Sequence, residues 1–122
     1  MSDNKEPLRQ RLEEKFPTIA ADILKERHRQ ISKWGDSDYV WDKYIRIMGE
    51  EFGEACEAIE DHDNTKDVYE EIPALQHLRD EVVQVAAVAA RMIQNIDRRL
   101  GDCYAAQNCL GSSDRRLAGE IV

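Results

Sequence analysis

Residues 82–90 read VVQVAAVAA and lie inside the longer segment ALQHLRDEVVQVAAVAARMIQNIDRRL at positions 74–100. From Val82 to Ile96 this segment places apolar side chains on nearly every side of a helix. A helix that is apolar all round has to be covered all round. The few helices that 122 residues can form hardly suffice for that, so we expect a second copy of the chain, in a homodimer or a dimer of dimers. The expected fold class is all-α, a helical bundle completed by homodimerisation.

The rest of the chain also has helical rather than strand periodicity, and no internal repeat is visible. Pro7 can begin a short helix that Pro17 interrupts, and Thr18 can then cap a helix that ends at Gly35. The next helix is expected from about Tyr39 to His62. Its apolar residues recur three and four positions apart, as Trp41, Ile45, Met48, Phe52, Ala55 and Ile59.

After a charged connection, Pro73 opens the last long helix and Gly101 closes it. These breaks divide the chain into an N-terminal arm or short helix (1–17), a helical domain (18–100) and a C-terminal tail (101–122). The tail has weak periodicity and is expected to hold a loop and at most a short helix.

Composition excludes several classes of function. The net charge is -8, from 17 Lys and Arg against 25 Asp and Glu, and no basic block occurs, which argues against a nucleic-acid polymer as partner. Three cysteines without a CxxC pair indicate reduced thiols rather than a disulfide framework or a zinc site. The N-terminus lacks the apolar region of a signal peptide, and the longest apolar stretch is too short to span a bilayer. We therefore expect a cytoplasmic protein that does not contact a membrane.

Carboxylates concentrate in the segment GEEFGEACEA at positions 49–58. Glu50, Glu51, Glu54 and Glu57 fall within an arc of roughly 120° on a helix, where like charges repel. Taken alone, such a face is most simply a solvated surface.

The later helix changes this interpretation, because Glu81 shares a face with Val85, Val88 and Met92 and is therefore partly desolvated. Gln84 follows one turn later on the same side. Two pairs with i, i+3 spacing on facing helices would form an oxygen-lined site, and such ligands suit Mg²⁺ or Mn²⁺. His62 and His77 are not spaced to join it, which disfavours zinc or a di-iron centre.

Three blocks together resemble a known family. EEFGEACEAI (50–59), LRDEVVQVAAVAARMIQNID (78–97) and ERHRQISKWG (26–35) are similar to segments of the MazG-like all-α nucleoside triphosphate pyrophosphohydrolases, in particular a small branch found in phages and bacteria. The third block matches the pattern E-R-x-x-Q-x-x-K-W-G. The resemblance covers roughly residues 24–100.

The resemblance implies an Mg²⁺-dependent enzyme that converts a (deoxy)nucleoside triphosphate and water to the monophosphate and pyrophosphate. Carried over by position, Glu51, Glu54 and Glu81 are metal ligands, and Glu50 is the adjacent acid that holds or deprotonates the attacking water. Glu51 is thus both a catalytic residue and a metal ligand. Where the family has a final Asp in its second pair, this chain has Gln84, which either weakens the metal site or contacts the substrate instead.

The block at positions 26–35 also supplies candidate substrate contacts. Lys33 and Arg27 could reach phosphates, although such residues are most often solvated. Trp34 could stack on a base or anchor a core or an interface, and Gln30 could read a base edge or cap a helix. Two rivals to the enzyme stay open: a catalytically weak nucleotide-binding or regulatory helical dimer, and a helical dimerisation protein with an acidic surface.

Overall fold

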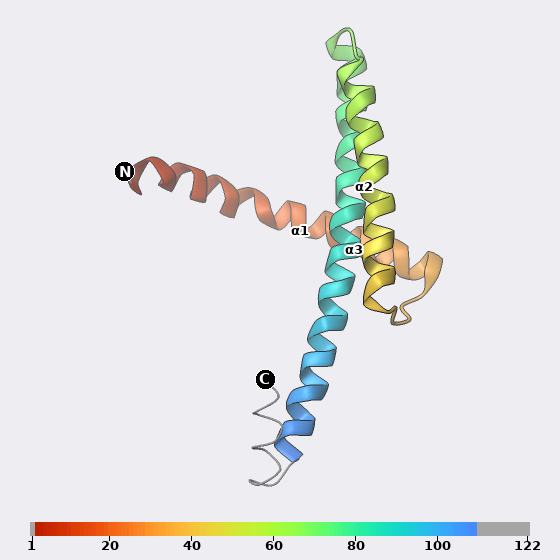
Figure 1. The fold of residues 1–122 in the computed structure, drawn as a ribbon. Helices are drawn as coiled ribbons and strands as arrows, with labels where there is room; N and C mark the ends of the chain where they lie inside the picture. Colours follow the sequence, from red (N-terminus) through yellow and green to blue (C-terminus); the bar gives the residue numbers. More distant parts are fainter. Residues whose placement is uncertain (1, 110–122) are drawn as a thin grey trace. The chain divides into compact units, whose positions relative to one another are not determined.

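The computed structural model describes residues 2–109, and over this range the protein is helical with no strand, which confirms the all-α class (Figure 1). A short 3-10 turn, Ser2–Lys5, precedes the helices α1 (Glu6–Trp34), α2 (Trp41–Asp63) and α3 (Val68–Cys109). The chain separates into two compact units, residues 1–90 and 91–122. The first unit holds α1, α2 and the beginning of α3, and it contains the whole candidate site. None of the described helices has the length and apolarity needed to cross a membrane.

Helix α1 begins and ends at the predicted signals, but it has no break in the middle. Pro7 lies in its first turn, where the missing N–H costs no helical hydrogen bond. Gly35, with φ of 77°, ends it and donates its N–H to the carbonyl of Ile31 at 2.8 Å. The predicted interruption at Pro17 is wrong, because the helix runs through this residue. Pro17 removes one hydrogen bond, and the carbonyl that loses its donor belongs to Glu13, an exposed residue that water can reach.

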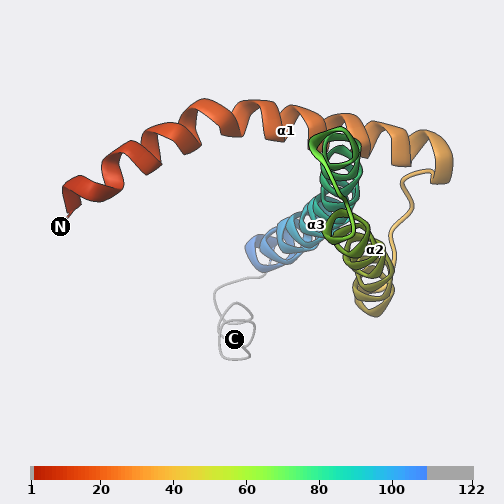
Figure 2. The ribbon, with the colours of Figure 1, turned by 90° about the horizontal axis from the view of Figure 1, so that it is seen from above.

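Helices α2 and α3 are joined by a loop of residues 64–67, so that α2 and the beginning of α3 form an antiparallel pair (Figures 1 and 2). The cap of α3 explains where it starts. Asp67 Oδ1 accepts a hydrogen bond from the backbone N–H of Glu70 at 2.9 Å. The helix therefore begins at Val68, five residues before the predicted start at Pro73, which lies inside its second turn.

The predicted end of α3 at Gly101 is also wrong, since the helix continues to Cys109. A glycine in a helix costs about 1 kcal/mol relative to alanine, which the surrounding helix formers can offset. Neither Pro17 nor Gly101 thus marks the end of an element, while the predicted division into domains stays a prediction. Residues 110–122, the rest of the predicted tail, lie outside the described residues.

The core of the first unit is small. Its most buried apolar residues are Tyr44, Ala55 and Ala58 from α2 and Ala87 and Val88 from α3. Three of these five side chains are alanines, so the two helices can approach each other closely. The tyrosine ring also packs near the aromatic residues at the start of α2, with Trp41 at 6.1 Å between ring centroids.

Most of the apolar stripe predicted along α2 is not covered by the described chain. Trp41, Ile45, Phe52 and Ile59 are 44%, 58%, 63% and 46% exposed, and only Ala55 of the predicted stripe is fully buried. Val82, in the apolar segment of α3, is also half exposed. The side of α2 that faces inward is instead the one with Tyr44, Ala58 and the half-buried Glu51. A large part of the apolar surface of α2 is therefore uncovered within the described residues.

Candidate metal centre

Three carboxylates from two helices converge in the first unit. Glu51 and Glu54 lie one turn apart on α2, and Glu81 lies on α3. One oxygen atom from each residue lies within 4.8 Å of the other two. Because α2 and α3 run antiparallel, residues far apart in the sequence are brought to the same height of the pair (Figure 1). This is the convergence that the two i, i+3 pairs predicted for these three residues.

Two of these carboxylates are partly removed from water. Glu51 and Glu81 are half-buried, whereas Glu54 is exposed. The Oε2 atoms of Glu51 and Glu81 are buried and have no hydrogen-bond partner among the described residues. A buried carboxylate oxygen without a donor is costly, and the cost falls if a proton or a cation binds there.

The pKa values of the same two residues reflect this environment. Burial is the main cause that raises the pKa of Glu51, and the charges of Glu54 and Glu81 raise it further. Burial also raises the pKa of Glu81, followed by the neighbouring carboxylate of Glu54, while His77 acts in the opposite direction. Both carboxyl groups thus hold a proton more tightly than a solvated glutamate, because burial removes the charged form from water and the neighbouring negative charges add to this effect.

The donor set fits a hard divalent cation. Carboxylate oxygens are the ligands that Mg²⁺ and Mn²⁺ prefer, and a cation placed among three of them would compensate both the burial and the mutual repulsion. His77 comes nearer than its spacing suggested, with Nε2 3.7 Å from Glu81 Oε1. That distance is too long for a hydrogen bond, so His77 contributes a charge when protonated rather than a fixed donor.

Helix α1 contributes a charged group that the sequence analysis did not single out. Glu26 accepts hydrogen bonds from Arg29 Nε at 2.8 Å and Nη2 at 2.7 Å, and from Gln30 Nε2 at 3.3 Å. The charge of Glu26 raises the pKa of Glu51, which places the two carboxylates within electrostatic reach. Glu26 is the first residue of the E-R-x-x-Q pattern, so the signal was present in the sequence without a role attached.

The other predicted site residues on α2 and α3 lie beside the cluster. Glu50 is exposed, and it neighbours Glu51 on the helix but is turned about 100° from it. Gln84, half-buried, lines a pocket between α1 and α3. Its predicted role as a ligand or a substrate contact stays a prediction, as does the role of Glu50 in activating water.

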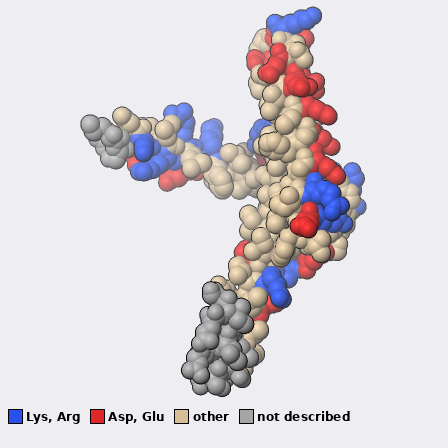
Figure 3. All heavy atoms as spheres, in the orientation of Figure 1, with Lys and Arg blue, Asp and Glu red and all other residues tan. Residues whose placement is uncertain are grey.

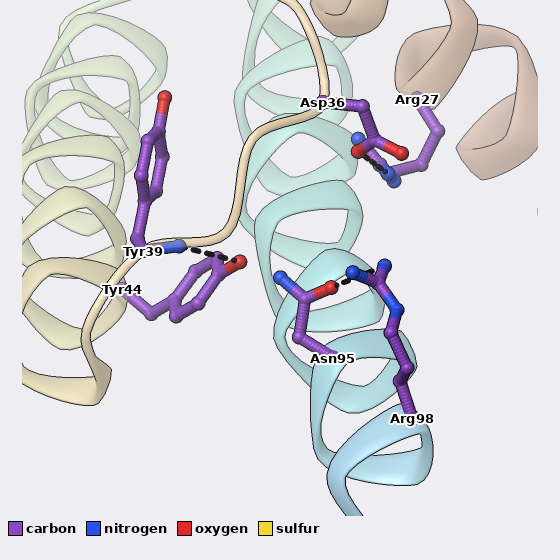
Figure 4. A network of polar contacts seen from close by, with 6 residues as sticks. All are labelled: Arg27, Asp36, Tyr39, Tyr44, Asn95 and Arg98. Carbon is purple, nitrogen blue, oxygen red and sulfur yellow. Dashed lines mark hydrogen bonds and ion pairs between the residues drawn. The ribbon is translucent and has the colours of Figure 1, made fainter. Parts of the chain in front are cut away.

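The predicted substrate contacts on α1 divide into a buried and an exposed pair. Arg27 is buried, and its Nη2 lies 3.2 Å from Oδ1 of Asp36 in the following loop (Figure 4). Gln30 is buried beside Glu26. Lys33 and Trp34 are exposed, with Lys33 Nζ 5.0 Å from the centroid of the Trp34 ring.

The loop after α1 is held at its other end by Tyr39, whose N–H donates to the hydroxyl oxygen of Tyr44 at 3.4 Å (Figure 4). With Arg27 at its beginning, this contact fixes the path from α1 to α2. The other contact in Figure 4 belongs to the second unit, where Arg98 Nη2 donates to Asn95 Oδ1 at 2.9 Å.

The fold and the cluster define a class: an all-α protein with three carboxylates converging between two antiparallel helices. Comparison of the chain with protein-family models, with curated proteins and with solved structures finds no match.

Proposed function

We propose that the protein is an Mg²⁺-dependent nucleotide pyrophosphohydrolase that converts a (d)NTP and water to the (d)NMP and pyrophosphate. The observation that carries the proposal is the cluster of Glu51, Glu54 and Glu81, two of which have buried oxygens without a donor. Those three residues were assigned by the resemblance of their sequence blocks to MazG-like enzymes. Convergence of the same three side chains is what a metal site of that kind requires.

In this proposal the three glutamates hold the cation, with Mg²⁺ expected and Mn²⁺ as a possible substitute. When bound, the ion would neutralise phosphate oxygens and lower the pKa of a coordinated water. Glu50, exposed next to Glu51, would accept a proton from the attacking water. The water oxygen forms a bond to the α-phosphorus, the bond to the α–β bridging oxygen breaks, and pyrophosphate leaves. Positioning and charge supply most of the rate in such reactions.

Trp34 and Lys33 are proposed to contact the nucleotide. The exposed ring of Trp34 can stack on a base, and Lys33 beside it can meet a phosphate. Gln30 is buried, and its Nε2 donates to Glu26 at 3.3 Å, so it is better suited to orient Glu26 than to contact the nucleotide. Arg27 is better suited to hold the loop after α1 than to bind substrate, because it is buried and paired with Asp36.

We further propose that the active form is a homodimer or a dimer of dimers in the cytoplasm. The supporting observation is the row of half-exposed apolar residues on α2, with Ile45, Phe52 and Ile59 spaced seven positions apart. A surface of this length on one helix is typical of an interface with another helix.

A panel of nucleoside triphosphates incubated with Mg²⁺ and assayed for pyrophosphate tests the reaction. We expect release of pyrophosphate by the parent and loss of it in Glu81→Gln. Glu57→Gln is the matched control, because Glu57 lies one turn from Glu54 but is exposed and outside the cluster. Failure of every nucleotide to yield pyrophosphate, or equal loss in both variants, would overturn the proposal.

Gln84 favours a second candidate function, a nucleotide-binding or regulatory dimer with weak turnover. An amide in place of the carboxylate leaves the site with one negative charge fewer than the family pattern. Binding of nucleotide that depends on Mg²⁺ and Glu54, without release of pyrophosphate, would support this candidate. Absence of any Mg²⁺ dependence would leave a dimerisation protein with an acidic surface. Figure 3 shows acidic side chains along one edge of the α2–α3 pair, toward its connecting loop.

A further inference from the structure

A pocket of about 420 Å³ lies between α1 and α3 in the first unit. Its volume is within the range of small-molecule sites, roughly 300–1,000 Å³, although such sites are mostly apolar. This one has a single apolar lining residue, Val83. The others are charged or amide side chains: Asp22, Lys25, Glu26 and Arg29 from α1, and Arg79, Asp80 and Gln84 from α3. A pocket of this character suits a highly charged ligand and not a nucleobase.

The pocket and the carboxylate cluster are linked through helices α1 and α3, although no glutamate of the cluster lines the pocket. Gln84 follows Glu81 by one helical turn, and Glu26, which lines the pocket, raises the pKa of Glu51. The charge of Glu51 in turn helps to raise the pKa of Arg29. A ligand that binds a cation at the cluster could therefore extend into the pocket.

Three cations line the pocket, and two of them are already oriented. Arg79 Nη2 lies 2.7 Å from Asp22 Oδ2, and Arg29 is held by two hydrogen bonds to Glu26. The Arg79 and Arg29 side chains stay about half exposed, at 50% and 48%, so each guanidinium has N–H groups available to a ligand. Lys25 has no ion pair to any residue of the described range, and the residue is exposed.

We propose that this pocket binds the terminal phosphates of the nucleotide, and the pyrophosphate product, through Lys25, Arg29 and Arg79. The identity of the ligand rests on the proposed function. Guanidinium groups bind phosphate oxygens in pairs with short charge-assisted hydrogen bonds. The terminal phosphates are the part of the substrate that carries most charge and no base, in agreement with the lining of the pocket.

The carboxylates of the pocket set its selectivity. Asp22, Glu26 and Asp80 balance the three cations, so the empty pocket has no net charge to attract a single phosphate. A pyrophosphate group has enough charge to meet Lys25, Arg29 and Arg79 together, and a cation held by Glu51, Glu54 and Glu81 would supply further positive charge. Asp22 also competes with the ligand for Arg79, because the two form an ion pair at 2.7 Å.

This competition gives a test in which two variants break the same ion pair with opposite consequences. Binding of radiolabelled inorganic pyrophosphate is measured by equilibrium dialysis at saturating Mg²⁺. Arg79→Gln should weaken binding by about tenfold, because it removes a charge-assisted contact. Asp22→Asn should tighten it by roughly threefold, because it releases Arg79 from a competing carboxylate. Lys25→Gln should weaken binding in the same direction as Arg79→Gln.

Arg9→Gln is the matched control. Arg9 also lies on α1 in an ion pair, with Glu6 at 3.4 Å, but it does not line the pocket. The affinity of the Arg9→Gln variant for pyrophosphate should equal that of the parent. A nucleoside monophosphate, which lacks the terminal phosphates, should bind all these variants equally.

The outcomes separate this inference from the proposed function. If Arg79→Gln and Asp22→Asn shift the affinity in the same direction, or not at all, the ion pair has only a structural role and the inference is wrong. This inference can therefore fail even if the parent protein hydrolyses nucleotides. If the two variants shift the affinity in opposite directions and the parent releases no pyrophosphate from nucleotides, the pocket binds pyrophosphate but the proposed hydrolase activity is refuted. Circular dichroism of each variant establishes that it is folded.

Discussion

Glu54 is the residue at which the metal hypothesis can be tested most directly. It is the exposed member of the cluster, and its charge raises the pKa of both Glu51 and Glu81. At a separation of 4.8 Å, which is the upper limit for the oxygens of the cluster, each repulsive pair costs about 0.9 kcal/mol in a water-like dielectric and about 3.5 kcal/mol at an effective dielectric constant of 20. Because Glu54 is exposed, the lower figure applies, and two pairs give about 2 kcal/mol.

Glu54→Gln should therefore stabilise the metal-free protein and remove the benefit of Mg²⁺. At about 4 °C per kcal/mol, the metal-free variant should melt about 8 °C above the metal-free parent. Added Mg²⁺ at 100 times its Kd should stabilise the parent by about 2.7 kcal/mol, and the variant by much less. Differential scanning calorimetry in chelator and then in Mg²⁺ measures both effects.

Glu57→Gln provides the control for this experiment. It removes the same charge from the same helix, but outside the cluster, and should keep the full response to Mg²⁺. The reasoning is refuted if Mg²⁺ does not stabilise the parent, or if it stabilises Glu54→Gln as much as the parent. The acidic face would then be a solvated surface.

Further predictions concern assembly, Gln84 and pH. Light scattering should give at least twice the chain mass of 14.1 kDa, and Phe52→Asp, in the exposed stripe of α2, should lower the mass; a folded monomeric parent would contradict the assembly. Gln84→Asp should lower the Mg²⁺ concentration for half-maximal activity and destabilise the metal-free fold, whereas unchanged titrations with Mg²⁺ and nucleotide would place Gln84 outside the site. The pKa values of Glu51 and Glu81 are raised in the folded state, so their contribution to stability is fully present below the unfolded pKa of about 4.3 and is lost as pH rises through the folded pKa. In chelator, the melting temperature of the parent should therefore gain more between pH 7 and pH 5 than that of Glu51→Gln, and equal gains would contradict this assignment.

Several features could be read from local patterns because their causes are local. The capping glycine Gly35 ended α1 as predicted, since its positive φ is a property of the residue itself. The i, i+3 spacing of Glu51 and Glu54 on one helix follows from helical geometry alone. By contrast, Pro17 and Gly101 carry equally local signals against a helix, and the long continuous helices override both.

The sequence pattern did not predict which faces of the helices are buried. The periodicity of α2 identified its apolar stripe but not the surface that covers it, and Phe52 is 63% exposed in the chain. The pocket residues Asp22 and Arg79 were missed because they are 57 positions apart, and no sequence spacing relates them.

The sequence by itself determined the all-α class, the acidic balance of charge and the identity of the three converging glutamates. The first two follow from helical period and composition, and the three glutamates were assigned from the resemblance of their sequence blocks together with the i, i+3 spacing on each helix. Only the tertiary structure decided that the Oε2 atoms of Glu51 and Glu81 are buried. It also decided that Arg27 pairs with Asp36 in the loop after α1, and that cations from α1 and α3 line one pocket. Burial and Coulomb energy depend on distances between helices, and these are set by packing rather than by position in the chain.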